Sequence, residues 1–420
     1  MKIFSVLTVI LLNSICTASY INKLNILGNE HTQYHIIQRE LYHPIPGEYD
    51  SVLAAQDRDR IYNLGLFSTV EINQIDSSYS VFVIETFRIL PLPLIEYEEG
   101  KGVSLGAGIV LLNFRGLNEQ LVLGGIQGKQ NTYFFEFEDP WAYGDHGSLS
   151  AGISQFNTES AVYNYSYTEN DLILGTGLYK GENHKYKSVI GLQKISLDTV
   201  SIQIDDYNIY SFDLENKFFN YIISIIKYEY DTRDIYIDPT NGEHLQMTLR
   251  PKLGIDSTSN RMSLNLSYKK YFSLKGLILD PVVSVKSQFL LKYTKDLPVF
   301  ENEYLGGEGF VRGYSPIIQD NPSQVQSKIE GSQIIYQNLQ LQHTLIERRD
   351  YNRIEAGIDL VYFVDFGISS RSIKSVNINR VLFGYGFGFR FFISGAGIIS
   401  IDFGYNPYGS WFIHPSDGNY

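Results

Sequence analysis

Arg312 is the residue of this sequence best suited to a specific polar contact. It lies between Gly309 and Gly313 in the segment 308–314 (EGFVRGY), and segments of alternating polar and apolar residues stand on both sides. A guanidinium is costly to bury without an acceptor, so this setting predicts an interior polar contact. The two glycines let the backbone bend without steric cost. The alternative is an external loop whose arginine meets solvent.

Patterns typical of catalysis are weak. We find no His-Glu-x-x-His metal motif and no glycine loop of the kind that binds phosphate at the start of a helix. The glycines of 384–388 (GYGFG) stand at every second position, which is strand spacing. Asp231 and Asp234 are more typical of a capped turn than of catalytic acids, and His31 and His35 lack a third metal ligand. The sequence therefore predicts no enzyme, no metal site and no cofactor.

The composition favours an all-β protein. Of 420 residues, 36 are Gly, 32 are Tyr and 25 are Phe, while only 19% are charged. Aromatic residues favour strands, and glycines favour tight turns. The net charge of −12 argues against nucleic acid as a partner, because phosphate binding needs a basic face. The length suits two or three soluble domains, or one large barrel with a small added module.

The N-terminus has the pattern of an export signal. Lys2 precedes an apolar run, and small residues at 16 and 18 suit a signal-peptidase cut. We predict a signal peptide over 1–18; a buried first helix and lipoprotein processing at Cys16 are the alternatives. Cys16 is the only cysteine, so the mature chain would have no disulfide. No later apolar run reaches the length of a spanning helix, so this chain would enter a membrane as strands.

Residues 19–90 predict a small α+β domain. Its expected order is strand, helix, helix, strand, strand, at 21–27, 32–40, 50–64, 68–74 and 80–85. Gly65 permits the left-handed cap that ends the second helix. The segment 91–94 (PLPL) cannot continue a strand ladder, so we place the domain boundary there.

Residues 91–420 contain repeated segments in which apolar and polar residues alternate. Leu245, Met247 and Leu249, for example, are separated by polar residues. Such a pattern fits a soluble β-sandwich or a membrane barrel whose apolar face points outward. About sixteen segments of about ten residues favour the barrel, because a sandwich uses fewer strands. The predicted fold is mainly β: a 16-stranded antiparallel outer-membrane β-barrel after one small α+β domain, with the segment 295–327 folded inward as a plug.

Two sets of motifs resemble one known family. The segments 21–32 (INKLNILGNEHT) and 60–72 (RIYNLGLFSTVEI) closely resemble a POTRA repeat, the periplasmic module of the BamA-type family of outer membrane protein assembly factors. The second part of the chain carries four further motifs in the order of that family: DPW at 139–141, YDTRD through DPTNG at 230–242, VRGY at 311–314 and FVDFG at 363–367. The resemblance covers nearly the whole mature chain.

The resemblance implies a structural latch. VRGY matches the family's loop-six signature, and the match places Asp365 on an inward-facing strand. A guanidinium–carboxylate pair would fix the loop inside the barrel better than a lysine could. The implied latch residues are Arg312, Gly313, Tyr314 and Asp365.

The resemblance also implies a function. It predicts a factor that inserts and folds β-barrel clients in the outer membrane, with the POTRA-like domain in the periplasm. The first barrel strand, near 102–112, would separate from the last strand and pair with the client, and Gly106 and Gly108 would weaken this seam. The implied partners are unfolded outer-membrane protein clients, outer-membrane lipid, and periplasmic chaperones or accessory lipoproteins, with no nucleic acid and no cofactor.

Three alternatives remain open. A two-partner secretion barrel usually has two POTRA modules and an N-terminal plug helix, whereas a TamA-like factor is not distinguishable from the sequence; the third is a passive porin or receptor. Two features depart from the family pattern. Asn338, Gln340 and Gln342 stand where the family often has a Glu and an Arg. The segment 399–405 looks like the penultimate strand, so the last strand is either short or missing.

Overall fold

The computed structural model describes residues 20–98, 102–128, 130–144, 146–159, 166–197, 217–277, 281–293, 298–307, 309–315, 328–351, 354–394 and 397–416. The predicted signal peptide (1–18), Glu308 and much of the predicted plug segment 295–327 lie outside the described residues. In the described part of the chain, no helix is long and apolar enough to cross a membrane.

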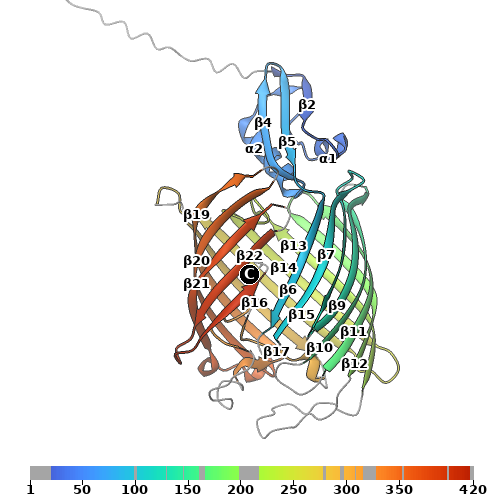
Figure 1. Ribbon diagram of the computed structural model, residues 1–420, viewed down its shortest axis with the longest axis vertical. Helices are drawn as coiled ribbons and strands as arrows, with labels where there is room; N and C mark the ends of the chain where they lie inside the picture. The colour runs from blue at the N-terminus through green and yellow to red at the C-terminus, as the bar shows by residue number, and fades with distance from the viewer. Residues whose placement is uncertain are drawn as a thin grey trace, which may run out of the picture.

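A small α+β unit precedes the large sheet, and it sits at one end of the molecule (Figure 1). Its three-stranded sheet has the order β2-β5-β4, in which β2 is parallel to β5 and β4 is antiparallel to it. The elements are β1 (Tyr20–Ile21), β2 (Lys23–Leu27), α1 (Tyr34–Gln38), β3 (Gly47–Glu48), α2 (Ser51–Asn63), β4 (Phe67–Ile75) and β5 (Ser78–Glu85). The first helix is therefore shorter than the sequence predicts, while the order of the larger elements agrees.

The small unit has its own apolar core, and a capping residue and a glycine mark the two ends of its longer helix. Ile36, Ile37 and Ile61 from the two helices pack with Val81 and Val83 of β5. Asp50 caps α2, because its carboxylate accepts hydrogen bonds from the first-turn N–H groups of residues 52 and 53. Gly65 follows the helix with a φ of +72°, the left-handed conformation that the sequence predicts.

Asp57 of α2 joins the helices of the small unit to its sheet. The side chain is fully buried and accepts hydrogen bonds from Tyr42 N (2.9 Å), His43 N (3.2 Å) and the Tyr79 hydroxyl (2.8 Å). It also forms an ion pair with Arg60. Burial and the hydrogen bond to Asp57 raise the pKa of Tyr79, so this hydroxyl remains a donor.

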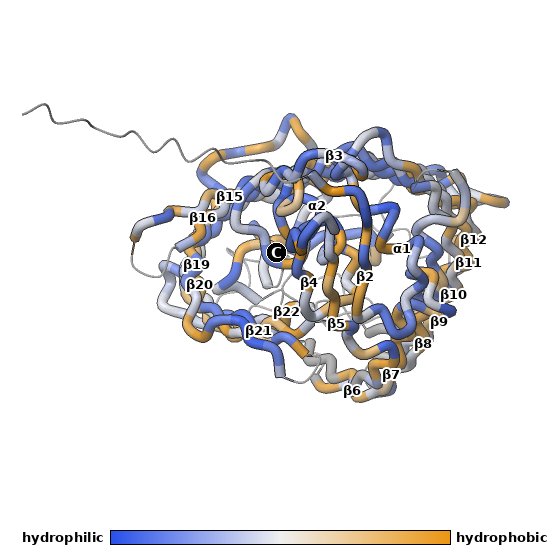
Figure 2. The backbone as a smooth tube through the Cα atoms, turned by 90° about the horizontal axis from the view of Figure 1, so that it is seen from above, coloured by the Kyte–Doolittle hydropathy of each residue, from blue (hydrophilic) through white to orange (hydrophobic). Residues whose placement is uncertain are grey.

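Most of the rest of the described chain forms one sheet of 16 antiparallel strands. Consecutive strands are neighbours throughout, and the sheet curves around a central space (Figures 1 and 2). The strands are β6 (Ile89–Glu98), β7 (Gly102–Phe114), β8 (Glu119–Gln127), β9 (Gln130–Tyr143), β10 (Gly147–Glu159), β11 (Ser166–Lys180), β12 (His184–Leu197), β13 (Phe218–Asp231), β14 (Gly242–Gly254), β15 (Arg261–Ser273), β16 (Val282–Tyr293), β19 (Gln333–Asp350), β20 (Glu355–Ser370), β21 (Leu382–Ile393), β22 (Gly397–Tyr405) and β23 (Trp411–Ser416).

The connection between β16 and β19 carries a small ladder of its own. The two-residue strands β17 (Glu303–Tyr304) and β18 (Glu330–Gly331) pair with each other, and a short 3-10 turn at Val299–Glu301 precedes them. Two further 3-10 turns, Ile373–Ser375 and Ile378–Arg380, lie between β20 and β21. The described part of the predicted plug is thus ordered by backbone pairing on both sides of Arg312.

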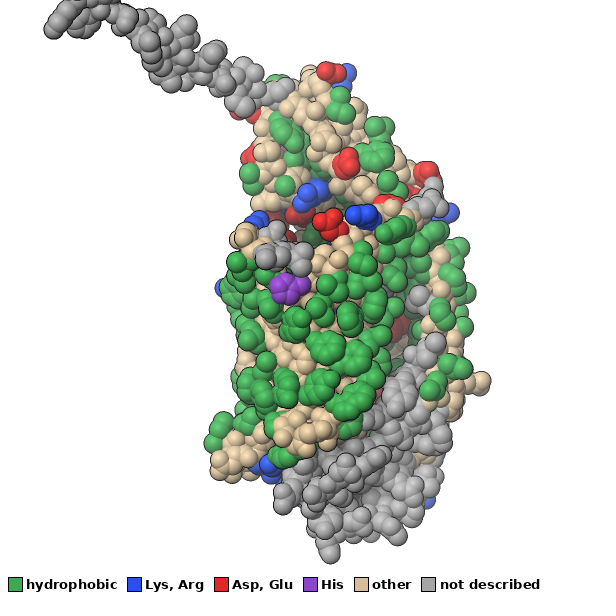
Figure 3. Space-filling model, turned by 60° about the vertical axis from the view of Figure 1, so that its left-hand side comes forward, with side chains coloured by type: hydrophobic (Ala, Val, Ile, Leu, Met, Phe, Trp, Pro, Cys, Tyr) green, Lys and Arg blue, Asp and Glu red, His purple; other side chains and the backbone are tan. Residues whose placement is uncertain are grey.

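The alternation of residue types separates an apolar outer wall from a polar interior. Leu105, Leu172, Leu174, Ile190 and Leu192 are each more than half exposed, and Figure 3 shows apolar side chains gathered on the face of the outer wall that it draws. Polar side chains such as those of Gln193, Thr248, Lys286 and Asn338 are instead buried. A soluble sandwich would have the opposite arrangement, so the apolar face points outward as the barrel prediction requires.

The two ends of the sheet correct two expectations. The segment 91–94 does continue a strand: it lies in β6, which pairs on one side with β7. Proline is tolerated there because β6 is an edge strand of the described sheet. The segment expected to be the first barrel strand is therefore the second, β7. At the other end, β23 follows β22 as a final strand of only six residues, and in the described residues no ladder joins β6 to β23.

Polar contacts hold the small unit against the turns at one end of the sheet. The Asn63 side chain donates to Asp234 O (3.0 Å) and accepts from Tyr236 N (2.9 Å). Its amide thus pairs with one C=O and one N–H of the turn after β13, as a neighbouring strand would. The Tyr62 hydroxyl donates to the Glu355 carboxylate at the start of β20. Further hydrogen bonds join Ser68 to Asp350 and Asn113 to Thr32. Because these contacts reach turns at widely separated strands, the small unit extends across the barrel end.

We predict that Asp57→Ala destabilises the small unit by about 3 kcal/mol, because two N–H groups, a hydroxyl and Arg60 lose a buried acceptor. The measurement is limited proteolysis of the purified protein, with cleavage mapped within residues 20–85. Asp59→Ala removes a carboxylate two positions along the same helix and serves as the control. Equal protection of the two variants would contradict the assignment.

Candidate functional site

The described residues 309–315 place Arg312 inside the barrel, against the strands β19 to β22. The Arg312 side chain is fully buried, with 0% of its surface exposed. Its guanidinium carbon lies 3.4 Å from the centroid of the Phe363 ring of β20, so the cation stacks on an aromatic face. An arginine in this environment needs paired carboxylates, as the sequence predicts.

Two carboxylates surround the Arg312 guanidinium. Asp365 of β20 accepts hydrogen bonds from Nε (2.8 Å) and Nη2 (2.9 Å), which is a bidentate pair. The same carboxylate accepts from the backbone N–H of Arg312 at 3.0 Å. Asp402 of β22 accepts from Nη1 at 3.0 Å. The arginine therefore joins two strands that are separated in the sheet by β21.

Other polar side chains hold the two carboxylates in place. Asp365 also accepts from the Tyr336 hydroxyl (3.1 Å) and from Asn338 Nδ2 (2.6 Å) on β19. Asp402 also accepts two hydrogen bonds from Arg390 of β21, at 2.6 and 3.2 Å. We call Arg312, Asp365, Arg390 and Asp402 the charge quartet. Its two cations balance its two anions, which lowers the cost of burying charge.

The electrostatic balance keeps Arg312 charged. Burial alone would lower the pKa of its guanidinium, but the facing Asp365 carboxylate has the larger combined effect and raises this pKa above its ordinary value. The guanidinium therefore acts as a permanent cation and hydrogen-bond donor. It has no role as a base, and the quartet is suited to holding the loop in one position.

The residues next to Arg312 contact the end of the sheet. Gly313 N–H donates to His414 Nε2 of β23 (3.0 Å), and Asn406 Nδ2 donates to Gly313 O (2.6 Å). The Tyr314 hydroxyl donates to Phe383 O (3.0 Å). The loop that carries Arg312 is thus bonded directly to the edge strand β23.

Glycines in the barrel wall make room for this loop. A Cβ on Gly384 would lie 1.9 Å from Arg312 O, and a Cβ on Gly404 would lie 2.3 Å from Gly313 N. Gly313 itself has a φ of +91° and approaches the backbone of Tyr405 closely. Two strands therefore present bare backbone where the loop rests, and Gly384 belongs to the alternating run 384–388 of the sequence.

The structure brings together only part of the predicted site. Arg312, Gly313, Tyr314 and Asp365 lie in one cluster. Gly106 and Gly108 do not lie on an open edge: both are on β7, which pairs with β6 and β8 through each of them. The prediction that the seam lies at Gly106 and Gly108 is therefore wrong, because β6, and not β7, is the edge strand of the described sheet.

Sequence reasoning missed several residues of the cluster. Arg390, Asp402 and His414 supply charge balance and a loop contact, and none was singled out. Arg390 and Asp402 are each the only charged residue among apolar, aromatic and small neighbours in a segment of alternating pattern. A single charge at a position where the alternation points into the barrel was the signal that could have identified them. Asn338, noted as a departure from the family pattern, donates directly to Asp365.

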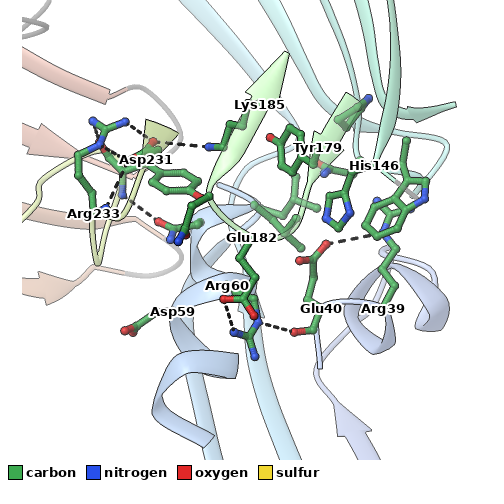
Figure 4. Close-up of a pocket in the computed structure, with 18 of the residues that line it drawn as sticks. Arg39, Glu40, Asp59, Arg60, His146, Tyr179, Glu182, Lys185, Asp231 and Arg233 are labelled. Atoms are coloured by element: carbon green, nitrogen blue, oxygen red, sulfur yellow. Dashed lines mark hydrogen bonds and ion pairs between the residues drawn. The ribbon is translucent and has the colours of Figure 1, made fainter. Parts of the chain in front are cut away.

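A cavity of about 600 Å³ lies between the small unit and the barrel end and is lined by residues of both (Figure 4). Stacked side chains line one wall: Arg39 lies 3.9 Å from the Trp141 ring centroid, Trp141 lies 3.7 Å from His146, and His146 lies 4.8 Å from Tyr179. Lys185, Asp231 and Arg233 line the other part. The motifs at 139–141 and 230–242 thus contribute to the junction between the two parts. Among the described residues, no group of three or more acidic, His or Cys side chains could hold a metal ion.

Comparisons with known proteins agree with this architecture. Residues 113–409 match the model of the Omp85 superfamily domain. The fold is similar to the crystal structure of BamA from Haemophilus ducreyi lacking POTRA domains 1-3, with a TM-score of 0.59 and 16% identity over 95% of this chain and 83% of that chain. It is also similar to CdiB from Escherichia coli, with a TM-score of 0.58 and 13% identity over 95% and 75% of the two chains.

CdiB from Acinetobacter baumannii gives a further match, with a TM-score of 0.52 and 15% identity over 94% of this chain and 73% of that chain. At these identities the structures show a shared fold. The match of the superfamily domain spans most of the chain, including Arg312, Asp365, Arg390 and Asp402.

We predict that Gly404→Ala displaces the loop, because the new Cβ would lie 2.3 Å from Gly313 N and 2.9 Å from Arg312 C. Trypsin cleaves after arginine, so cleavage of the detergent-solubilised protein between residues 312 and 313 should become about tenfold faster or more. Gly108→Ala is the control, since its nearest neighbour would be Leu123 O at 3.3 Å. An uncleaved Gly404→Ala variant would show that the wall does not need bare backbone here.

Proposed function

The chain belongs to the Omp85 superfamily, and from this premise we propose that it is an outer membrane protein assembly factor that inserts and folds β-barrel clients. The observation that carries the proposal is the sheet itself. Its 16 strands end in β6 and β23, and the described residues of these two strands form no ladder with each other. We place the barrel in the outer membrane and the small unit in the periplasm.

Unpaired strand edges explain why a template is useful. An unfolded client strand carries N–H and C=O groups that lipid cannot satisfy, and each unsatisfied group costs several kcal/mol in hydrocarbon. An edge strand of the assembly factor would supply partners for these groups. The seam between β6 and β23 is the place where such an edge exists in the described sheet, so we assign client pairing to this seam.

The small unit would act as a POTRA-like module. Its sheet order leaves β2 and β4 as edge strands, and either edge could bind an extended segment by strand addition. Its contacts with the turns at the barrel end hold it next to the opening of the barrel at that end. Unfolded outer-membrane protein is the proposed partner, together with lipid and with periplasmic chaperones or accessory lipoproteins; no nucleic acid and no cofactor enter the proposal.

The charge quartet would hold the barrel interior in one state. Arg312 joins the loop to β20 and β22, and Gly313 joins it to β23 through His414. A change in the position of this loop would therefore alter the support of the strand that borders the seam. In this proposal Arg312, Gly313, Tyr314 and Asp365 form a structural latch, and no catalytic step is involved.

A translocation barrel of the two-partner or TamA-like type is the alternative. The similarity to the two CdiB structures favours it, because the TM-score of the E. coli protein, 0.58, nearly equals that of the BamA structure, 0.59. A passive porin or receptor has less support, since it would need neither the latch nor the docked small unit.

We predict that Arg312→Ala lowers client assembly without abolishing expression. The substitution leaves Asp365 and Asp402 short of a cation, which costs about 3–5 kcal/mol for a buried charge and releases the loop. In a strain that relies on this variant, the measurement is the abundance of outer-membrane β-barrel proteins, with a several-fold decrease expected. Arg349→Ala, at an exposed position near the end of β19, is the matched control.

Normal abundance in the Arg312→Ala strain would refute the role of the latch. Depletion of the whole protein followed by outer-membrane proteomics tests the function itself. A broad loss of β-barrel proteins supports general assembly, whereas loss of one exported protein supports the translocation alternative. Channel conductance with no change in outer-membrane protein levels would instead identify a passive pore.

A further inference from the structure

The prolines of β6 occupy particular positions in its hydrogen-bond pattern. In an antiparallel pair, residues alternate between those that bond to the neighbouring strand and those whose N–H and C=O point away. Leu112 N–H donates to Arg88 O (2.8 Å), which sets the phase of the β6–β7 ladder. Counting in twos through the uninterrupted register, residues 90, 92 and 94 bond to β7. Pro91 and Pro93 therefore face the free edge.

The proline of β23 occupies the same kind of position. Asn406 N–H donates to Ser410 O (3.1 Å), which sets the phase of the β22–β23 ladder. In the register that follows, residues 412, 414 and 416 bond to β22, while Trp411, Ile413 and Pro415 point away. All three prolines of the two edge strands thus lie where the missing N–H would have faced the seam.

This placement makes the seam poor in donors and leaves its acceptors in place. Between residues 89 and 97, β6 has five edge-facing positions, and two of them are proline. On β23 one of the three edge-facing positions is proline. Proline retains its C=O but has no N–H, so a continuous ladder through these positions cannot form. The two edges can therefore form fewer hydrogen bonds with each other than two strands of the same length without proline could form.

A proline inside the sheet offers a comparison. Pro251 lies in β14, between two strands. The β13–β14 register pairs Ile223 with Lys252 and Ile226 with Leu249, and the positions between them are unpaired. A proline in the interior thus coincides with a local interruption of a ladder. The two strands that border the seam contain three prolines, and in each case the lost donor would have pointed toward the seam.

We propose that Pro91, Pro93 and Pro415 are positioning residues that keep the seam between β6 and β23 weakly paired. They remove donors from the seam without disturbing the ladders to β7 and β22. The exposed carbonyls of β6 then favour an incoming strand that supplies N–H groups. The use of the seam by a client rests on the proposed function; the weak pairing itself does not.

Hydrogen–deuterium exchange of the full chain in detergent or lipid nanodiscs tests the weak pairing. In Pro91→Val with Pro93→Val, the restored donors should stabilise pairing, and exchange of peptides covering 411–416 should slow about tenfold. These peptides have the same sequence in both proteins, so the readout does not come from the added amides. Pro251→Val makes the same chemical change away from the seam and should leave exchange at 411–416 unchanged.

Pro415→Val provides an independent reading from the other strand, and it applies even if the double variant folds poorly. It should slow exchange of peptides covering 89–98. Unchanged or faster exchange in the strand opposite each substitution would overturn the inference. Slower exchange together with normal client levels would support the weak pairing of the seam but refute the pairing of clients with it. The two claims can therefore fail separately.

Discussion

The buried ion pair between Arg312 and Asp365 is the interaction on which the interior of this barrel depends. A guanidinium with no exposed surface is stable there only because two carboxylates, an aromatic face and a balancing arginine surround it. These partners come from three neighbouring strands, β20, β21 and β22. The loop can rest among them only because the wall is bare at Gly384 and Gly404. One arginine thus fixes the relative position of a loop and three strands.

A second constraint acts on the backbone. Within the apolar layer every N–H and C=O needs a partner, and a curved sheet provides one everywhere except at its two edges. Both edge strands of this protein contain proline, whereas the other strands of the sheet pair on both sides. The charge quartet therefore fixes the loop in the interior, while the seam between β6 and β23 is the weakly paired part of the wall. The contact of Gly313 with His414 connects the two.

The sequence allowed the large features of the fold to be predicted because strand alternation has a period of two and persists through the barrel half. The latch was predicted from VRGY and FVDFG, and its geometry agrees with the pairing that these motifs imply. Asp402 and Arg390 were missed, because which inward-facing charges meet depends on strand register and loop path. β6 was missed because proline normally ends a ladder, and only the topology reveals that this strand has a free side. The error moved the expected seam by one strand, from the edge to Gly106 and Gly108.

The contacts of Arg312 also bear on how the chain itself reaches its native state. Asp365 lies 53 residues after Arg312, Asp402 lies 90 residues after it, and His414 lies 101 residues after Gly313. The loop therefore has no complete set of partners until the final strands of the barrel have formed, since an arginine with only some of its acceptors is poorly stable in the interior. Seating of the loop is consequently a late event in folding. It acts as an internal check that the C-terminal strands are present and in register before the interior becomes rigid.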